Sequence, residues 1–98
     1  MSDPVLAPAD VDAALAEQGI AWERQDDQLT TTVTLRDFAG ALAFVNEVGA
    51  AAEAANHHPD IDIRWNKVHL VLTTHDAGGL TVLDLALAAA IDRLRPLR

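Results

Sequence analysis

The strongest constraint on the fold is a run of alternating residues in the second half of the chain. Apolar side chains occupy every second position over residues 61–65 and again over residues 68–72. Such alternation is typical of strands with one buried face. Between the runs lies Asn66-Lys67, and asparagine tolerates the positive φ of a tight hairpin turn. With this turn every apolar residue meets an apolar partner, and the predicted pairs are Trp65 with Val68, Ile63 with Leu70, and Ile61 with Leu72.

The first third of the chain predicts a helix followed by another hairpin. The helix covers Pro8–Gln18, where it begins at a proline and ends before a glycine. Residues 1–7 are expected to form a loose tail before it. Two short strands, Ile20–Gln25 and Leu29–Leu35, then flank an Asp-Asp turn signal at residues 26–27.

A longer helix is predicted over residues 37–56. One face carries apolar residues with helical spacing: Phe38, Leu42, Val45, Val48, Ala52 and Ala55. A second face carries Phe44, Ala51 and Ala54, which a single amphipathic stripe does not need. The small residues of this second face either reflect high helix propensity in solvent or form a packing surface for another subunit. We favour the packing surface, because Phe44 would otherwise be exposed.

The last helix has the clearest start signal. Thr81 and Asp84 form a capping pattern, and Leu80 and Leu85 are spaced as a hydrophobic staple. The element order is therefore α-β-β-α-β-β-α, which predicts an α+β fold with a four-stranded antiparallel sheet and three helices packed on one face. We expect a single domain over residues 1–98, with edge strands that can pair between subunits.

The charge and composition argue against several classes of protein. A net charge of −8 disfavours binding to a nucleic-acid backbone, and the absence of cysteine excludes disulfides and thiolate metal sites. The N-terminus has neither the basic nor the apolar region of a signal peptide. No apolar run approaches the ~20 residues that cross a bilayer. We therefore expect a cytoplasmic protein that binds neither nucleic acid nor membrane.

Two of the four histidines stand side by side where the long helix must stop. Pro59 follows His57 and His58, and it forces His58 towards an extended conformation. Extending the predicted hairpin register places His75 opposite His58, and directly opposed residues have Cβ atoms about 4.5–5.5 Å apart. The last helix begins soon after His75, which brings Asp84 close as well. Three histidines and a carboxylate are therefore expected to converge.

Three interpretations of this cluster compete. The histidines could simply end a helix, where a cationic ring is favourable, but that does not explain why His75 reaches the same place. They could bind a metal with Asp60 or Asp84, although adjacent residues rarely aim both rings at one ion and no H-x-H or H-E-x-x-H spacing is present. They could also perform general acid–base chemistry without a metal, because imidazole has a reference pKa of about 6.5.

One spaced pattern resembles a known family. The pattern consists of Glu53-x-x-x-His57-His58-Pro59, Trp65, His75 and Asp84. The stretch WNKVHLVLTTHDAGGLT adds to it. These residues are similar to those of the pterin-4a-carbinolamine dehydratases, and the similarity covers almost the whole chain apart from the tail and the first helix. The resemblance implies the same α-β-β-α-β-β-α fold.

The resemblance also implies an activity. It points to a hydro-lyase that removes water from 4a-hydroxytetrahydropterin and gives quinonoid dihydropterin, in the recycling of tetrahydropterin for aromatic amino acid hydroxylation. By resemblance the catalytic residues are His57, His58 and His75. We expect His57 and His75 to donate and accept protons around the 4a carbon, and His58 to orient the pterin. No metal or other cofactor is implied. Further pterin contacts are implied at Pro59, Thr74, Asp76 and Ala77.

The remaining motif residues are expected to support the site. Glu53 lies one helical turn before His57 and can reach its ring, although a solvent-facing charge is an equal alternative. Asp84 is interpreted mainly as a helix cap and Trp65 as a core residue.

The expected partners are the pterin substrate and further copies of the chain, in a homodimer or homotetramer through an edge strand and the 37–56 helix. The alternative function is a non-catalytic pterin-binding or protein-interaction module. It arises because animal relatives of the resembled family also serve as dimerisation cofactors of a homeodomain transcription factor.

Overall fold

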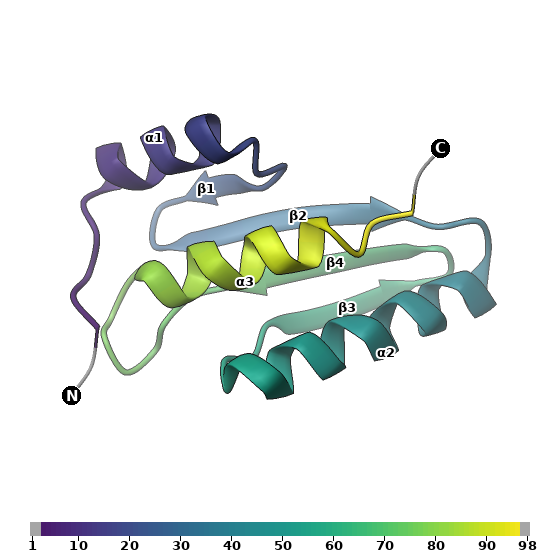
Figure 1. The fold of residues 1–98 in the computed structure, drawn as a ribbon. Helices are drawn as coiled ribbons and strands as arrows, with labels where there is room; N and C mark the ends of the chain where they lie inside the picture. The colour runs from purple at the N-terminus through teal and green to yellow at the C-terminus, as the bar shows by residue number, and fades with distance from the viewer. Residues whose placement is uncertain (1–2, 97–98) are drawn as a thin grey trace.

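The computed structural model describes residues 3–96. Its elements are, in chain order, α1 (Pro8–Gln18), β1 (Glu23–Gln25), β2 (Gln28–Thr34), α2 (Phe38–Ala55), β3 (Asp60–Arg64), β4 (Lys67–Leu72) and α3 (Val82–Asp92). The four strands form one antiparallel sheet in the spatial order β1-β2-β4-β3. Figure 1 shows the three helices on the same side of this sheet. The predicted α+β fold and element order are therefore confirmed.

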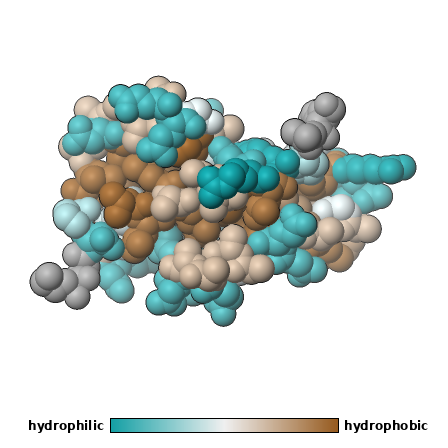
Figure 2. All heavy atoms as spheres, in the orientation of Figure 1, coloured by the Kyte–Doolittle hydropathy of each residue, from teal (hydrophilic) through white to brown (hydrophobic). Residues whose placement is uncertain are grey.

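The core lies between the sheet and its helices. Alternate residues of the two central strands are buried on the helix side, and these are Leu29, Val33, Val68, Leu70 and Leu72. Helix α3 crosses the middle of the sheet (Figure 1), and its buried residues include Leu85, Leu87, Ala88 and Ile91. Apolar residues also fill the space between α1 and α3, while hydrophilic residues cover the outside of α1 (Figure 2). Burial of this apolar surface is the main stabilising contribution to the fold.

The β3–β4 hairpin has a different register from the one that the alternation predicted. Ile63 pairs with Val68, and Ile61 pairs with Leu70, so the turn is Trp65-Asn66 rather than Asn66-Lys67. Asn66 is fixed in this turn because its side-chain amide donates to the carbonyl of Leu35 at 3.0 Å and its own carbonyl accepts from the Leu35 amide at 2.7 Å.

The shift in register also corrects the position of Trp65. This residue has a φ of 50° and is 66% exposed, so the prediction of a core tryptophan opposite Val68 is wrong. The observed register differs from the predicted one by two residues. Because this shift is even, all the remaining strand side chains stay on the face of the sheet that the alternation assigned to them.

Helix α2 has the predicted extent, but its buried face is only partly the predicted one, because Val48 and Ala52 are buried as expected while other residues of that face are not. Asp37 caps its start by accepting from the amide of Gly40 at 2.8 Å. Phe44 is buried in the core, whereas Phe38 and Leu42 from the predicted core face are 47% and 43% exposed. The assignment of Phe44 to a subunit interface is therefore wrong. The helix is apolar around most of its circumference, so its periodicity does not single out one face, and contact with the sheet selects the one that contains Phe44.

Two N-terminal predictions also need correction. Within the described part of the predicted tail, the amide of Leu6 donates to the carbonyl of Leu80 at 2.8 Å, and Leu6 packs against the core. Residues 3–7 are therefore not loose, while residues 1–2 lie outside the described range. The first strand begins at Glu23 instead of Ile20. The amide of Ala21 donates instead to the Asp92 carboxylate at 2.6 Å.

None of the helices within residues 3–96 has the length and apolarity that a membrane crossing requires.

Candidate active site

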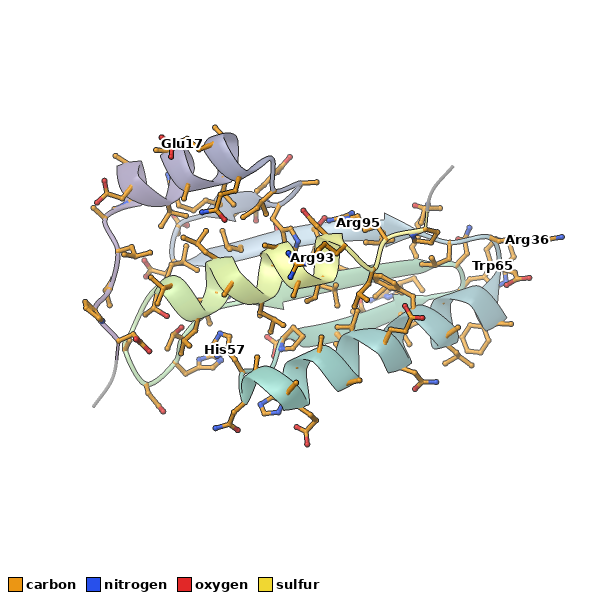
Figure 3. All side chains as sticks on the ribbon, in the orientation of Figure 1. Glu17, Arg36, His57, Trp65, Arg93 and Arg95 are labelled. Carbon is orange, nitrogen blue, oxygen red and sulfur yellow. The ribbon has the colours of Figure 1, made fainter. Side chains whose placement is uncertain are left out.

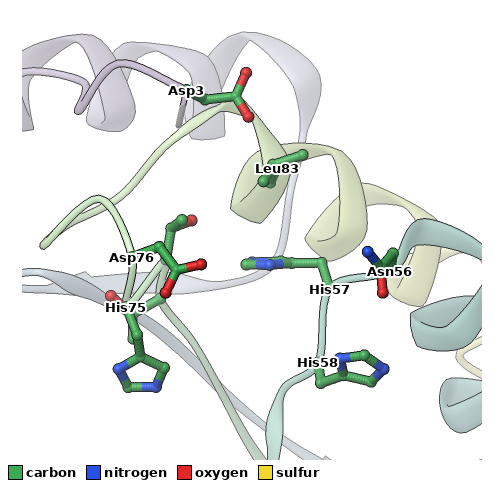
Figure 4. Close-up of a pocket in the computed structure, with 9 residues that line it drawn as sticks. Asp3, Asn56, His57, His58, His75, Asp76 and Leu83 are labelled. Carbon is green, nitrogen blue, oxygen red and sulfur yellow. The ribbon is translucent and has the colours of Figure 1, made fainter. Parts of the chain in front are cut away.

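A hollow of about 420 Å³ opens where α2 ends and α3 begins. It is lined by Asp3, Asn56, His57, His58, Thr73, Thr74, His75, Asp76 and Leu83. These residues come from three separate parts of the chain: the N-terminal segment, the end of α2, and the stretch that runs from the end of β4 into the first turn of α3 (Figure 4). Its volume lies in the range of about 300–1,000 Å³ that is typical of small-molecule pockets.

The C-terminus of α2 sets the direction of the first two histidines. Asn56 takes a left-handed conformation with a φ of 50° and ends the helix. The amide of His57 then donates to the carbonyl of Ala52 at 3.1 Å, and the amide of Asn56 donates to the carbonyl of Glu53 at 3.2 Å. These two bonds form a Schellman motif, which turns the chain sharply away from the helix axis. His57 and His58 therefore leave the helix at the pocket instead of extending it.

The third histidine is carried by a closed loop. Thr74 and Gly79 pair across it, with the amide of Thr74 donating to the carbonyl of Gly79 at 3.1 Å. The amide of Gly78 donates to the carbonyl of Thr74 at 3.0 Å, and Gly78 has a φ of 78°, which favours glycine. This short bridged loop presents His75 on the opposite side of the pocket from His58 (Figure 4).

His57 is held by a buried carboxylate. Its Nε2 lies 2.6 Å from Oδ1 of Asp84, whose side chain is 0% exposed, and the His57 side chain is only 10% exposed. An ionised carboxylate can only accept hydrogen bonds, so Nε2 is the protonated nitrogen of His57. In the neutral ring Nδ1 is then the nitrogen that can accept a proton. The arrangement fixes both the orientation and the tautomer of this imidazole.

The same carboxylate is held by two threonines. Oδ2 of Asp84 accepts from the Thr74 hydroxyl at 2.7 Å and from the Thr81 amide at 3.0 Å. Because the Thr74 proton is used in this bond, the Thr81 hydroxyl donates to Thr74 Oγ1 at 2.9 Å. Thr81 and Asp84 also form the capping box of α3, as the sequence predicted. Among the described residues, no buried side-chain polar atom lacks a hydrogen-bond partner.

His58 has a different and more exposed partner. Its Nε2 lies 2.5 Å from Oε2 of Glu53, and both side chains are more than half exposed. The expected contact of Glu53 with His57 is therefore wrong. The sharp turn at Asn56 rotates His57 away from the helix and brings the next residue back over Glu53. His57 is consequently free to pair with Asp84.

The other predicted site residues are divided between the pocket and other places. Thr74 and Asp76 line the pocket, whereas Pro59 and Ala77 are outside its lining. Trp65 lies at the far end of the β3–β4 hairpin from His57 (Figure 3), so it is not part of this pocket. The sequence did not single out Asp3, Asn56, Thr73 or Leu83 as lining residues. Of these, Asn56 had an available signal, because asparagine before a histidine pair is suited to a left-handed helix end.

No group of three or more His, Asp or Glu side chains within residues 3–96 is arranged to hold a metal ion.

Comparison with protein families gives a match over almost the whole chain. The model of the family described as pterin 4 alpha carbinolamine dehydratase matches residues 4–94. A protein of Chloroflexus aurantiacus with the provisional name pterin-4-alpha-carbinolamine dehydratase is 52% identical over 91 residues, which are 93% of this chain and 97% of that protein. A protein of Thermomicrobium roseum with the same provisional name is 52% identical over 82 residues, covering 84% and 88% of the two chains.

Solved structures share the fold. A crystal structure from Brucella melitensis, described as a transcriptional coactivator/pterin dehydratase, superposes with a TM-score of 0.86 at 26% identity, covering 94% of this chain and 99% of that one. A pterin dehydratase-like protein described as a RuBisCO assembly factor of the alpha-carboxysome has a TM-score of 0.63 at 22% identity, over 79% and 89% of the two chains. At that identity the second comparison shows a common fold alone.

Proposed function

The chain belongs to the pterin 4 alpha carbinolamine dehydratase family, and on this premise we propose that it removes water from 4a-hydroxytetrahydropterin. The product is quinonoid dihydropterin, which a reductase can return to the tetrahydropterin used by aromatic amino acid hydroxylases. The observation that carries the proposal is the convergence of three imidazoles on one pocket, one of them oriented by a buried carboxylate.

The reaction needs two proton transfers. The bond between the 4a carbon and its hydroxyl oxygen breaks, and the oxygen leaves as water after it accepts a proton. A ring N–H loses its proton, and the electrons of that bond form a ring C=N double bond. One proton is therefore added and one removed, with no oxidation or reduction. Two imidazoles on opposite sides of a planar ring can supply both transfers, and general acid–base help is typically worth about 10²–10⁴-fold.

His57 is suited to the role of base. Asp84 holds the proton on Nε2, which leaves Nδ1 as the acceptor for the proton of the ring N–H. The carboxylate would then stabilise the imidazolium that forms, as the aspartate does in a Ser-His-Asp triad.

His75 is suited to the role of acid. It is exposed, so its ring can regain a proton from water after each turnover. His58, held by Glu53 at the rim, is assigned to orienting the pterin. Thr74 and Asp76 complete the proposed contacts on the loop that carries His75.

Stopped-flow kinetics with chemically generated 4a-carbinolamine test the proposed activity. The compound loses water slowly by itself, and we expect the protein to accelerate this loss in proportion to its concentration. The matched control is the His57→Ala/His75→Ala double variant, which lacks both proposed proton carriers. If the wild-type protein and this variant give the same decay rate as buffer, the activity is refuted. A scaffold that binds pterin without catalysis would then be the better description.

We also propose that the chain forms a homodimer or homotetramer. β3 is an edge strand, so one row of its backbone groups is available for pairing with another strand. Helix α2 and the β3–β4 hairpin also expose large apolar side chains, namely Phe38, Leu42, Ile61 and Trp65. The α2 surface near its C-terminus is pale brown in Figure 2, in keeping with its alanine content. A second copy of the chain would cover both the open edge of β3 and these exposed apolar side chains. We further propose that the protein works in the cytoplasm.

A further inference from the structure

The N-terminal strap, defined as residues 3–6, is docked on the loop that carries His75. Its Leu6 amide donates to the carbonyl of Leu80 at 2.8 Å, and the Leu6 side chain packs against the core. A Cβ added to Gly79 would meet Cγ1 of Val5 at 2.9 Å, closer than unbonded carbon atoms allow. The glycine therefore provides the room in which the strap lies against the loop.

The strap ends at the pocket. Asp3 is among the lining residues and is only partly exposed. Figure 4 shows it on the Leu83 side of the opening, away from both His75 and His58. A carboxylate thus lies on a part of the pocket wall that carries none of the three histidines. The proposed proton transfers leave this group without a role.

The chemistry of a pterin supplies such a role. Its pyrimidine ring carries an N3–H beside a 2-amino group, so one edge presents two parallel N–H donors. This is the fork that a guanidinium offers to a carboxylate, and such paired bonds are among the stronger hydrogen bonds in proteins. The histidines must surround the 4a carbon at the ring fusion. The amino edge of the same ring therefore extends beyond them to another part of the pocket wall.

We propose that Asp3 binds the N3–H and 2-amino edge of the pterin, and that the strap is thereby a specificity-determining part of the site. The proposal rests on the proposed function. Asp76 is the other carboxylate of the pocket lining, but it directly follows His75 and is exposed. It therefore lies beside the group that must reach the 4a carbon, whereas Asp3 comes from a separate segment.

Binding of two unreactive ligands tests this role. The first is 6-methylpterin, and the second is 6-methyllumazine, in which a carbonyl oxygen replaces the 2-amino donor beside N3–H and N1 gains a hydrogen. We expect the wild-type protein to bind the pterin at least about tenfold more tightly than the lumazine. Asp3→Asn should lose about tenfold in pterin affinity and most of this preference. Asp76→Asn should retain the preference, and so should the matched control Asp10→Asn, because Asp10 lies at the start of α1 outside the pocket lining.

The outcomes separate this proposal from the proposed activity. If the wild-type protein dehydrates the carbinolamine and Asp3→Asn keeps both its pterin affinity and its ligand preference, the role of Asp3 is overturned while the activity stands. A preference that disappears in Asp76→Asn instead overturns it in the same way. A wild-type protein that binds neither ligand and lacks activity overturns both. Equal melting temperatures of the variants would exclude unfolding as the cause of a lost preference.

Discussion

Nε2 of His57 lies 2.6 Å from Oδ1 of Asp84, and the carboxylate that makes this contact is fully buried and also caps α3. One side chain thus fixes the start of a helix and the orientation of an imidazole. Its other oxygen is occupied by Thr74 and the amide of Thr81, so the carboxylate cannot rotate without breaking two further hydrogen bonds. His57 is therefore held by the core of the protein, whereas His58 is held at its surface.

Asp84→Asn should weaken both activity and stability. An amide that keeps its oxygen towards Thr74 and Thr81 turns an NH₂ group towards Nε2 of His57, which forces the ring into the other tautomer. We expect kcat/KM to fall by about 10–100-fold. The free energy of unfolding should fall by about 1–3 kcal/mol because a buried hydrogen-bond network is disturbed. Steady-state kinetics and urea denaturation measure the two effects. Asp62→Asn, on exposed strand β3, is the control and should change neither quantity appreciably.

The three histidines should contribute unequally to the rate. His57→Ala and His75→Ala should each lower kcat/KM by about 10²–10⁴-fold, because each removes one proposed proton transfer. His58→Ala should act mainly through a higher KM, since this residue is assigned to orienting the substrate. Kinetics of the three variants at one pH and protein concentration check the order. An activity that survives His57→Ala unchanged would contradict the assignment of the base.

Glu53→Gln should have little effect. The carboxylate contacts His58 in an exposed pair, and exposed pairs contribute about 0–1 kcal/mol. We expect a change in kcat/KM of less than about fivefold, in contrast to the larger loss expected for Asp84→Asn. Side-by-side kinetics of the two variants measure the difference. Equal losses would mean that His58 carries as much of the chemistry as His57.

Substitutions at two glycines with positive φ should separate an effect on stability from an effect on activity. Gly78 has a φ of 78° in the loop that carries His75, and Gly19 has a φ of 63° at the end of α1. An alanine at either position should cost about 1–2 kcal/mol of stability because of the left-handed conformation. Only Gly78→Ala should also lower kcat/KM, since the strained loop would move His75. Thermal melts and kinetics of both variants provide the comparison. An unaffected rate in Gly78→Ala would show that the loop tolerates the change.

Trp65→Ser should weaken self-association and leave the fold intact. The side chain is 66% exposed at the tip of the β3–β4 hairpin, so its removal costs little within one chain. If a second copy covers it, the variant should dissociate at higher protein concentration than the wild type. Sedimentation equilibrium over a concentration series measures this shift. The buried Trp22 remains as a fluorescent reporter of unfolding. A wild-type protein that is monomeric throughout would refute the proposed oligomer.

The fold could be predicted because its signals are local. The capping pattern of Thr81 and Asp84, the N-terminal Pro8 and the alternation of the hairpins each identify an element from neighbouring residues. The hairpin register was missed by two residues because both registers pair apolar with apolar side chains. What decides between them is the bonding of Asn66 to Leu35, a contact between segments far apart in the sequence.

The candidate site could be predicted only in part, for the same reason. The convergence of the histidine pair with His75 was expected from an extended hairpin register, and that register is wrong by two residues, so His58 and His75 are not the directly opposed pair that it predicted. They nevertheless line one pocket. The choice of Glu53 as a partner of His57 failed because helical spacing no longer applies once Asn56 has ended the helix. The docking of the strap carries no periodic signal at all, since it depends on the space above a single glycine.

The double use of Asp84 makes the segment from Thr74 to Asp84 a spacer of fixed length. An inserted or deleted residue would shift this carboxylate along the helix, so either the first turn would fray or the imidazole would lose its support. Substitutions within the spacer that preserve its turn are far easier to accommodate. Relatives whose exposed helix residues vary widely are therefore expected to keep the same number of residues between the positions of Thr74 and Asp84.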